Sequence, residues 1–403
     1  MRLESATSAS TAAKGAPEQR DRDPRLLVVV SDDYGELGNA LYFLNRLALS
    51  PRPLVLMPRS LAQAEAGDEH FDAHTYATLD DLRRAVTEFR PDVALIFSAY
   101  LLAVGRRLSW LSSLALFRLL RRQGVRIATS DPFLGLLRHP ASLRFDDVLR
   151  GTRPSGRLAA RALGSLIALR TWLISRAVRD AWHIYPAPLD HGRGGVRHRW
   201  LAYYNDQAPA VAGEPDAAAD AQAKRWLFVL SRVDHDMQVA RHGSAFVDSV
   251  AGRLLDARRV GARVLLIGPA PLVAALRAKL PEDPLIEVRQ ELAYPRYMRA
   301  LMDAEYVFFW NFYSFSIIHR IIAGRPVFFF DEGHMVKILP ALQQAGIDMY
   351  YGGWRPPLLP AGEALDRATL DAQALEARAA FARIVARLRT CDAPRDMLRA
   401  IAR

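Results

Sequence analysis

Three aspartates occupy places where a carboxylate could remove a proton from a substrate. Asp32 and Asp33 directly follow the apolar run at residues 26–30, and Asp131 comes shortly after a similar run at residues 126–129. A carboxylate within hydrogen-bond reach of a hydroxyl group can act as its general base. The alternative for Asp32 and Asp33 is a solvated turn or a helix cap. The candidate catalytic residues are therefore Asp33, then Asp32 and Asp131.

Two serines lie where a helix is expected to begin. Ser314 and Ser316 follow the apolar run at residues 306–310 and precede a helical pattern that ends before Gly324. A helix N-terminus presents free backbone N–H groups and a positive partial charge, which suits a phosphate. The alternative is that both serines only cap the helix. Gly324 is expected to stop this helix, and Pro326 to restart the chain as a strand.

These side chains must be positioned by alternating strands and helices. In the first half, apolar β-rich runs with helical patterns between them occur at residues 26–30, 54–57, 93–97, 126–129 and 182–185. Continuous apolar runs of this length are typical of strands buried on both faces of a parallel sheet. A turn at residues 31–38 is expected to lead into a helix at residues 39–49.

A second series of strands follows a stretch rich in Ala, Pro and Asp. Its strands are expected at residues 226–230, 264–267, 286–288, 306–310 and 327–330. With 403 residues, 51% of them hydrophobic, the chain is long enough for two cores. We predict an α/β protein with a disordered tail (1–23), two Rossmann-like domains (24–205 and 224–365), a linker (206–223) and C-terminal helices (366–403).

The charge balance favours an anionic partner. Lysine and arginine number 54 against 43 aspartates and glutamates, which gives a net charge of +11. Arginine makes paired hydrogen bonds to phosphate, so a phosphate-bearing partner is one explanation, and the amino-acid bias of a GC-rich genome is the other. The basic residues are scattered and form no recognised nucleic-acid motif, so nucleic acid is not expected as a partner.

Cysteine usage and hydropathy favour a cytoplasmic protein. Cys391 is the single cysteine, which rules out an intramolecular disulfide and fits a reducing compartment. No basic-then-apolar leader is recognised at the start, and no uninterrupted apolar run approaches the roughly 18 to 20 residues that span a bilayer.

Two segments mix arginine with large apolar residues. Residues 101–122 and 157–179 each contain a tryptophan, several leucines and several arginines. Basic helices of this kind can lie on an anionic membrane surface, which would make the protein peripheral at the inner face of the membrane. The alternative is a pair of ordinary amphipathic helices whose arginines face water.

One segment of the second half carries a more specific pattern. Residues 292–333 contain a helix bearing Tyr297 and Leu301, a strand, a loop, and a helix that leads into Gly324-Arg325-Pro326-Val327 and another strand. This order resembles the C-terminal, donor-binding half of GT-B glycosyltransferases, whose last helix ends in a similar Ala-x-Gly-x-Pro-Val. The resemblance covers residues 225–335 well, and it implies two Rossmann-like halves that face each other across a cleft. The same half-domain also serves nucleotide-sugar epimerases.

The resemblance implies a set of donor-binding residues. Arg232, after the first strand of this half, would grip the leaving diphosphate, and Glu332 would hold the ribose; a surface arginine is the alternative for Arg232. Many retaining members have two glutamates where Asn311 and His319 stand here, so the resemblance favours inversion. His319 could instead be a buried histidine that faces a neighbouring strand. The donor-binding set is Ser231, Arg232, Gly268, Asn311, Ser314, Ser316, His319, Glu332 and Lys337.

On the acceptor side, an inverting enzyme needs its base in the N-terminal half. Some inverting GT-B families have an aspartate in the loop that Asp33 occupies, and the acceptor-side loop would include Gly35, Gly38 and Asn39. Asp331, Glu332 and His334 lack compact ligand spacing, and the resemblance implies metal-independent chemistry. No cofactor is expected, because the nucleotide sugar is a substrate.

The expected function is therefore an inverting glycosyltransferase. It would move a sugar from a nucleoside-diphosphate sugar to a glycan, lipid-linked or small-molecule acceptor, for example in polysaccharide biosynthesis. Two alternatives stay open. One is a nucleotide-sugar epimerase of the same fold, which needs no acceptor. The other is a glycosyltransferase-like binding protein without catalytic activity.

Overall fold

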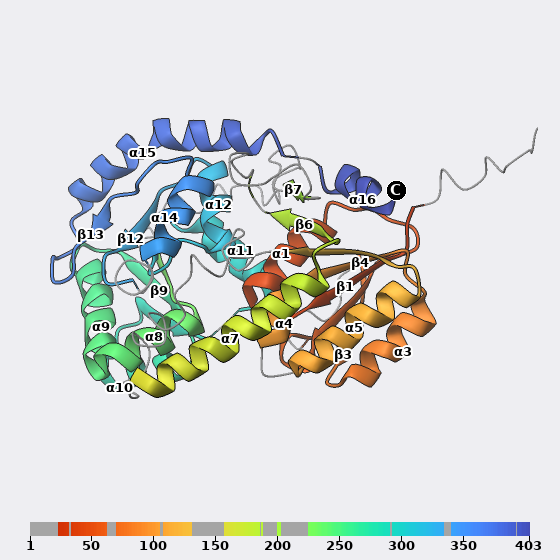
Figure 1. The fold of residues 1–403 in the computed structure, drawn as a ribbon. Coiled ribbons are helices and arrows are strands. Elements are labelled where there is room, and N and C mark those ends of the chain that lie inside the picture. Colours follow the sequence, from red (N-terminus) through yellow and green to blue (C-terminus); the bar gives the residue numbers. More distant parts are fainter. Residues whose placement is uncertain are drawn as a thin grey trace, which may run out of the picture.

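Two parallel β-sheets, each flanked by helices, stand side by side in the computed structural model of the protein (Figure 1). The structure describes residues 23–31, 34–62, 70–104, 108–130, 157–185, 187, 200–202, 225–290, 292–333, 340–391 and 393–403. Every strand pairing within these ranges is parallel. The prediction of an α/β fold with two Rossmann-like halves is confirmed.

The N-terminal half contains a seven-stranded sheet. Its strands are, in spatial order, β3 (Asp72–Tyr76), β2 (Leu54–Pro58), β1 (Leu26–Val30), β4 (Val93–Phe97), β5 (Arg126–Ser130), β6 (Trp182–Tyr185) and β7 (Trp200–Ala202). Successive residues of β1 belong to two different cores, as expected for a strand covered on both faces. The helices of this half are α1 (Tyr34–Leu44), α2 (Arg59–Ala62), α3 (Leu79–Phe89), α4 (Ala99–Val104), α5 (Trp110–Arg122) and α7 (Arg157–Ala177).

The C-terminal half contains a six-stranded sheet. Its strands are, in spatial order, β10 (Ile286–Arg289), β9 (Arg263–Ile267), β8 (Arg225–Val229), β11 (Tyr306–Phe309), β12 (Val327–Phe330) and β13 (Leu358–Leu359). The rings of Phe228 and Phe308 stack on one face, with their centroids 4.6 Å apart. The helices are α8 (Arg232–His242), α9 (Ser244–Arg259), α10 (Ala270–Lys279), α11 (Tyr294–Asp303), α12 (Phe315–Ile322) and α14 (Pro340–Met349).

Each sheet has one point at which the order of its strands reverses. In the first sheet β1 lies between β2 and β4, and in the second β8 lies between β9 and β11. The connections that leave two such neighbouring strands run to opposite faces of the sheet, which opens a crevice at their carboxyl ends. A ligand of the N-terminal half is therefore expected beside the ends of β1 and β4, and one of the C-terminal half beside the ends of β8 and β11.

The start of α1 differs from the expectation. The sequence predicts a turn at residues 31–38 and a helix at residues 39–49, but α1 is Tyr34–Leu44. Gly35, Gly38 and Asn39, which the sequence predicts to lie in a loop, therefore lie in a helix, so the predicted conformation is wrong. Their place on the acceptor side stays a prediction. A Cβ at Gly38 would lie 3.4 Å from the ring of Tyr294 in the other half, at van der Waals distance, so α1 runs close to α11 here.

A buried arginine holds α12 in place. Arg320 is fully buried, and its guanidinium donates hydrogen bonds to the main-chain oxygens of Leu301, Ala304, Glu305 and Pro326. These carbonyls belong to the end of α11, the start of β11 and the start of β12. Arg320 therefore fixes α12 against three neighbouring segments. As predicted, Gly324 follows the helix with a positive φ of 64°.

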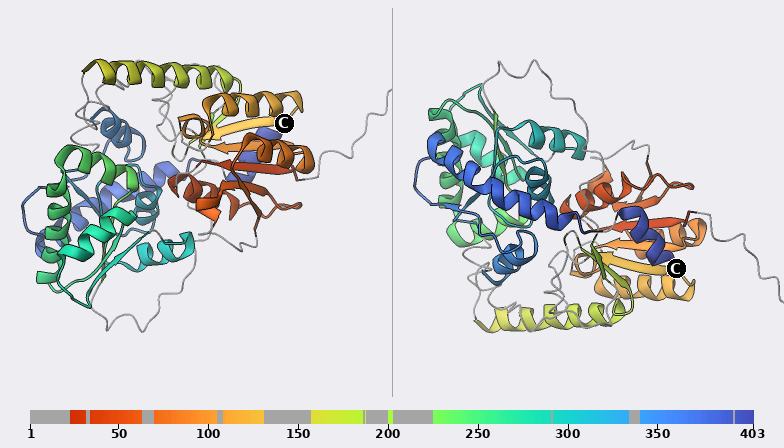
Figure 2. Two further views of the ribbon diagram at one scale, coloured as in Figure 1. Left: turned by 90° about the horizontal axis from the view of Figure 1, so that it is seen from below. Right: turned by 90° about the horizontal axis from the view of Figure 1, so that it is seen from above.

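The last two helices carry the chain back to the first half (Figure 2). The long helix α15 (Arg367–Leu388) contacts α12, and α16 (Pro394–Ala402) contacts β5 of the N-terminal sheet. Arg126 of β5 donates a hydrogen bond of 3.0 Å to the main-chain oxygen of Arg403. One cluster of buried residues, to which α16 contributes Met397, Leu398 and Ile401, runs through both halves.

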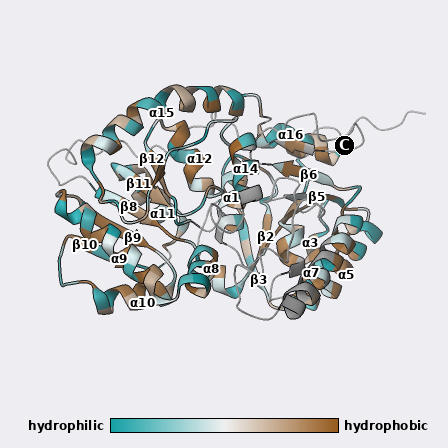
Figure 3. Cartoon of the chain, turned by 60° about the vertical axis from the view of Figure 1, so that its left-hand side comes forward, coloured by the Kyte–Doolittle hydropathy of each residue, from teal (hydrophilic) through white to brown (hydrophobic). Residues whose placement is uncertain are grey.

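The hydropathy of the chain follows its layers (Figure 3). Central strands such as β11 and β12 are apolar and buried, and the outer helices such as α9 and α15 alternate between polar and apolar residues. Within the described part of the chain, no helix combines the length and apolar character needed to span a membrane.

Candidate functional site

A capped helix begins at the carboxyl end of β8. Ser231 Oγ donates a hydrogen bond of 2.6 Å to Asp234 Oδ2, and the Asp234 N–H donates one of 3.1 Å to Ser231 Oγ. This Ser-x-x-Asp capping box fixes the first turn of α8. Asp234 is fully buried, so its carboxylate must be satisfied by nearby donors.

Asn311 joins this turn to the loop that follows β11. Its Nδ2 donates a hydrogen bond of 2.8 Å to Asp234 Oδ2, and its Oδ1 accepts hydrogen bonds from the N–H groups of Tyr313 and Ser314 at 3.1 and 3.0 Å. Both the nitrogen and the oxygen of the amide thus make hydrogen bonds, which fixes the orientation of the side chain. Ser231 and Asn311 come together at the reversal point of the sheet, and they set the position of the start of α12.

A row of hydroxyl groups lies at the N-terminus of α12. Ser314 Oγ donates a hydrogen bond of 3.0 Å to Ser316 Oγ, which shares one of 2.6 Å with the Tyr297 hydroxyl. Ser314 is the N-cap residue, but its side chain makes no capping bond to the helix. Burial raises the pKa of Tyr297 to about 12, so its hydroxyl keeps its proton at neutral pH. The predicted helix start is confirmed, and three hydroxyls meet there.

His319 lies one turn further along α12, at the contact with the N-terminal half. Its imidazole is edge-on to Phe315 and to Tyr42 of α1, with centroids 4.8 and 5.6 Å apart. Burial, with a smaller contribution from Arg46, lowers the pKa of His319 from 6.5 to about 3. The ring is therefore neutral. His319 is partly buried, and it faces a helix of the other half rather than a strand. Its contact with a donor stays a prediction.

Arg232 and Glu332 do not join the hydroxyl row. The side chain of Arg232 is exposed, and its Nε lies 3.5 Å from Asp236 one turn along the helix. Glu332 is held by α9: Ser249 Oγ donates a hydrogen bond of 3.0 Å to Oε1, and Arg253 one of 3.4 Å to Oε2. Both carboxylate oxygens of Glu332 thus have partners in the protein. Contact of either residue with a donor stays a prediction.

Glycines fix the backbone at two of the strand ends. A Cβ at Gly268 would lie 3.0 Å from Leu272 and 3.3 Å from Leu266, so the predicted donor-site glycine allows α10 to pack on β9. A Cβ at Gly333 would lie 2.2 Å from the main-chain oxygen of Trp310, which no substitution can accommodate without a shift. The turn after β12 is thereby pressed against the end of β11.

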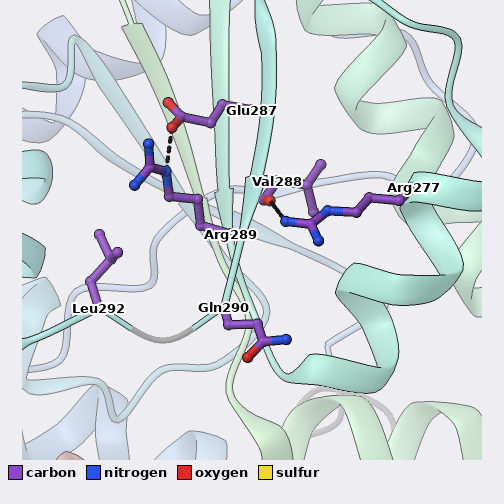
Figure 4. A pocket seen from close by; sticks show the side chains of 6 residues that line it. All are labelled: Arg277, Glu287, Val288, Arg289, Gln290 and Leu292. Carbon is purple, nitrogen blue, oxygen red and sulfur yellow. Dashed lines mark hydrogen bonds and ion pairs between the residues drawn. The ribbon is translucent and has the colours of Figure 1, made fainter. Parts of the chain in front are cut away.

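A depression lies at the carboxyl end of the edge strand β10 (Figure 4). Arg289 pairs there with Glu287, and Arg277 donates a hydrogen bond of 3.1 Å to the main-chain oxygen of Val288. Figure 4 shows Gln290 and Leu292 below this pair, at the strand end. None of the predicted donor-binding residues lines this depression.

Several predicted residues cannot be placed. Asp32, Asp33, Asp131 and Lys337 lie outside the described residues. Within the described ranges, no three His, Cys, Asp or Glu side chains gather as metal ligands would. Of the predicted donor set, the structure brings together Ser231, Asn311, Ser314 and Ser316.

Sequence reasoning missed Asp234, Tyr297 and Tyr42. The Ser-x-x-Asp spacing of the α8 cap is a readable signal for Asp234. No local pattern singles out Tyr297, whose partner Ser316 lies on another helix, or Tyr42, whose partner His319 belongs to the other half.

Known structures similar to this chain include glycosyltransferases, all at low sequence identity. The chain is similar to the calicheamicin glycosyltransferase CalG4 (TM-score 0.52, 13% identity, 94% of this chain and 98% of that one). It is also similar to the spinosyn rhamnosyltransferase SpnG complexed with thymidine diphosphate, with a TM-score of 0.51 and 13% identity. The spinosyn forosaminyltransferase SpnP gives a TM-score of 0.50 and 14% identity. Each of these two matches covers 94% of this chain and 100% of the other.

Comparison of the sequence with known families and proteins finds no further relative. No protein-family model matches the sequence, and no curated protein matches it significantly. At 13 to 14% identity the structural likeness concerns the fold, and it extends over both halves. The chain has the GT-B fold of nucleotide-sugar-dependent glycosyltransferases.

Proposed function

We propose that the protein is a glycosyltransferase that moves a sugar from a nucleoside-diphosphate sugar to an acceptor hydroxyl, with inversion at the anomeric carbon. The observation that carries this proposal is the network of Ser231, Asp234, Asn311 and Ser314. It fixes the N-terminus of α12 at the reversal point of the C-terminal sheet, where open α/β sheets bind ligands. The SpnG structure is a complex with thymidine diphosphate, which supports a nucleoside diphosphate as the ligand.

The α12 N-terminus offers neutral donors to a diphosphate. Ser314, Ser316 and Tyr297 carry hydroxyl protons that can turn from one another toward phosphate oxygens. The positive end of the helix dipole favours the negative charge that develops on the leaving group. Oδ2 of the buried Asp234 accepts hydrogen bonds from Ser231 and Asn311, so this carboxylate orients the two loops that lead to the α12 N-terminus.

The chemistry requires a base on the acceptor side. The acceptor oxygen forms a bond to the anomeric carbon as the bond to the diphosphate breaks, and the base takes the hydroxyl proton. Asp33 is our candidate for this base, with Asp32 and Asp131 as the others. Asn311 and His319 lack the carboxylates of the retaining pattern, and His319 is neutral and enclosed. Both facts support inversion.

A thermal-shift panel tests the donor half of this proposal. One nucleoside diphosphate should raise the melting temperature, because a ligand at 100 times its Kd adds about 2.7 kcal/mol to the stability of the folded state. Ser316→Ala should weaken that response, and Leu375→Ser, at an exposed position on α15, should not. A chain that responds to no nucleotide is not a glycosyltransferase, and one that isomerises the sugar without acceptor is an epimerase.

Mutation of Asp33 tests the acceptor half. Asp33→Asn should leave nucleotide affinity unchanged and lower turnover by about 10² to 10⁴, the usual contribution of a general base. Full activity in this variant would pass the role to Asp32 or Asp131.

We further propose that the protein works at an anionic membrane surface on a lipid-linked acceptor. The helix α7 runs along the outer edge of the molecule, where it contacts α4 and α5 (Figure 2). Its Leu166, Leu169 and Trp172 are 42%, 52% and 44% exposed, and Arg176 lies 4.9 Å from the Trp172 ring. Residues 157–179 contain five arginines and no Asp or Glu. Exposed Leu166, Leu169 and Trp172 beside Arg176 fit the interface of an anionic bilayer.

A further inference from the structure

A carboxylate is buried at the carboxyl edge of the N-terminal sheet. Glu36, in the first turn of α1, is 3% exposed. Its Oε2 accepts a hydrogen bond of 2.9 Å from the Oγ of Ser130, the last residue of β5, which is also buried. Within the described part of this half, no other Asp or Glu is buried.

Burial of this carboxylate is costly, and packing alone does not require it. An apolar side chain of similar size would hold α1 on the sheet without the loss of hydration that a carboxylate suffers. What Glu36 adds is direction, because a hydrogen bond to a charged acceptor fixes both distance and angle. It joins α1 to the end of a strand two places away in the sheet, since β4 lies between β1 and β5.

The neighbouring strand ends are also polar. Ser31 directly follows β1 and is 1% exposed, and its Oγ has no hydrogen-bond partner among the described residues. At the end of β5, Thr129 Oγ1 donates a hydrogen bond to the Ile96 oxygen of β4 and accepts one from the Ala99 N–H, each of 3.0 Å. The ends of β1, β4 and β5 therefore form one connected polar edge at the reversal point of this sheet.

We propose that Glu36 is a positioning residue for the acceptor. Glu36 stands three residues after Asp33, and Ser130 directly precedes Asp131. Their hydrogen bond therefore joins the residue three places after one candidate base to the residue directly before another. The acceptor hydroxyl would meet its base at this edge, across from the hydroxyl row of α12. This inference rests on the proposed function and deepens its acceptor side.

Removal of the hydrogen bond should affect the acceptor and spare the donor. Glu36→Gln keeps the size of the side chain and removes its charge, and Ser130→Ala removes the donor hydroxyl. Each should lower kcat/KM for the acceptor by about 10- to 100-fold, the scale of a misplacement of about 1 Å. The thermal shift with nucleoside diphosphate should stay as in the unmodified protein.

Further variants separate positioning from general stability. Ser130→Thr retains the hydroxyl and should recover most of the activity that Ser130→Ala loses. The double variant of Glu36→Gln and Ser130→Ala should be no slower than the worse single variant, because both remove one interaction. Ser113→Ala is the matched control, since Ser113 is a buried serine of the same half that bonds to the Leu102 oxygen on α4.

The outcomes distinguish this inference from the proposed function. An unmodified protein without a nucleotide response contradicts the proposed function. Intact nucleotide response with unchanged acceptor kinetics in Ser130→Ala contradicts the positioning role. If Glu36→Gln has a lowered melting temperature, the acceptor kinetics of Ser130→Ala and Ser130→Thr test the positioning role instead. A small buried hydroxyl can be removed with little change in packing. An equal loss of acceptor and donor binding in these variants would also overturn the inference.

Discussion

The phenol ring of Tyr42, from the N-terminal half, lies edge-on to the imidazole of His319, from the C-terminal half, with 5.6 Å between their centroids. The guanidinium of Arg46 lies 3.5 Å from the centre of the same Tyr42 ring. The two halves thus meet through a stack of one cation, one phenol and one neutral histidine. Protonation of His319 would place a second positive charge in this contact.

His319 should make stability depend on pH. Its pKa of about 3 in the folded protein lies below the 6.5 of the free side chain, so the unfolded state binds more protons between these values. The stabilisation is complete above pH 6.5 and is lost as the pH falls toward 3. Between pH 6 and 5, the free energy of unfolding should fall up to about 1.4 kcal/mol per pH unit more steeply than in His319→Phe. Equal slopes in urea titrations of the two proteins would contradict this assignment.

Asn311→Asp should disrupt the donor half. The new carboxylate would face Asp234 Oδ2 at the 2.8 Å now bridged by the amide N–H, and like charges at this distance repel. We expect a lower melting temperature and a loss of at least tenfold in nucleotide affinity, with partial recovery at acid pH as the pair takes up a proton. Asn45→Asp, at an exposed position of the other half, is the control. Calorimetric titration with nucleotide measures the affinity of both variants. Equal affinity in the two would refute the role of Asn311.

Gly333→Ala and Gly252→Ala should have opposite effects. The added Cβ at position 333 would meet the Trp310 oxygen at 2.2 Å, so the turn after β12 must move, at an expected cost of about 1–3 kcal/mol. A Cβ at Gly252, inside α9, meets nothing within 4 Å, and alanine there should stabilise the helix by about 0.5–1 kcal/mol. Urea unfolding gives both values. A stable Gly333→Ala protein would show that the close contact is not enforced.

The exposed apolar side of α7 should bind anionic vesicles. The protein should sediment with vesicles that contain phosphatidylglycerol, less with phosphatidylcholine alone, and less at high salt. Replacement of Leu166, Leu169 and Trp172 by serine should lower binding at least tenfold, because each change removes exposed apolar area that the membrane would bury. Leu375→Ser, 62% exposed on α15, should bind as the unmodified protein does.

Two results would contradict a membrane role for α7. One is equal sedimentation of the triple variant and the unmodified protein. The other is a dimer in light scattering that the triple variant abolishes, which would assign the same surface to a second copy of the chain.

Strands can be predicted from the sequence wherever they are buried on both faces. β1, β4 and β12 are continuous apolar runs, and their expected positions agree with the structure. β3 is not among the expected strands, because this edge strand reads Asp-Ala-His-Thr-Tyr and is mostly exposed. The predicted start of α1 is wrong because Gly35 and Gly38 suggest a turn, whereas both lie inside the helix.

The site can be predicted as far as it depends on strand ends and helix starts. Ser314, Ser316 and Asn311 are found because their place follows from the order of elements. Glu332 also stands at a strand end, but that rule does not give the direction of a side chain, and its carboxylate turns to Arg253. The contact of Tyr42 with His319 joins two halves, so no local pattern encodes it.

The position of α16 has a consequence for synthesis of the chain. β5 ends at Ser130, but α16, which covers it, ends only at Ala402. At about 5–20 residues per second, roughly 15–55 s separate the two during translation. For that time the side of β5 that α16 contacts, and the cluster that Met397, Leu398 and Ile401 complete, stay uncovered, although the rest of the first half has left the ribosome. The N-terminal half is therefore synthesised first but completes its packing last. Its exposed apolar surface can bind chaperones or other nascent chains until α16 emerges from the ribosome.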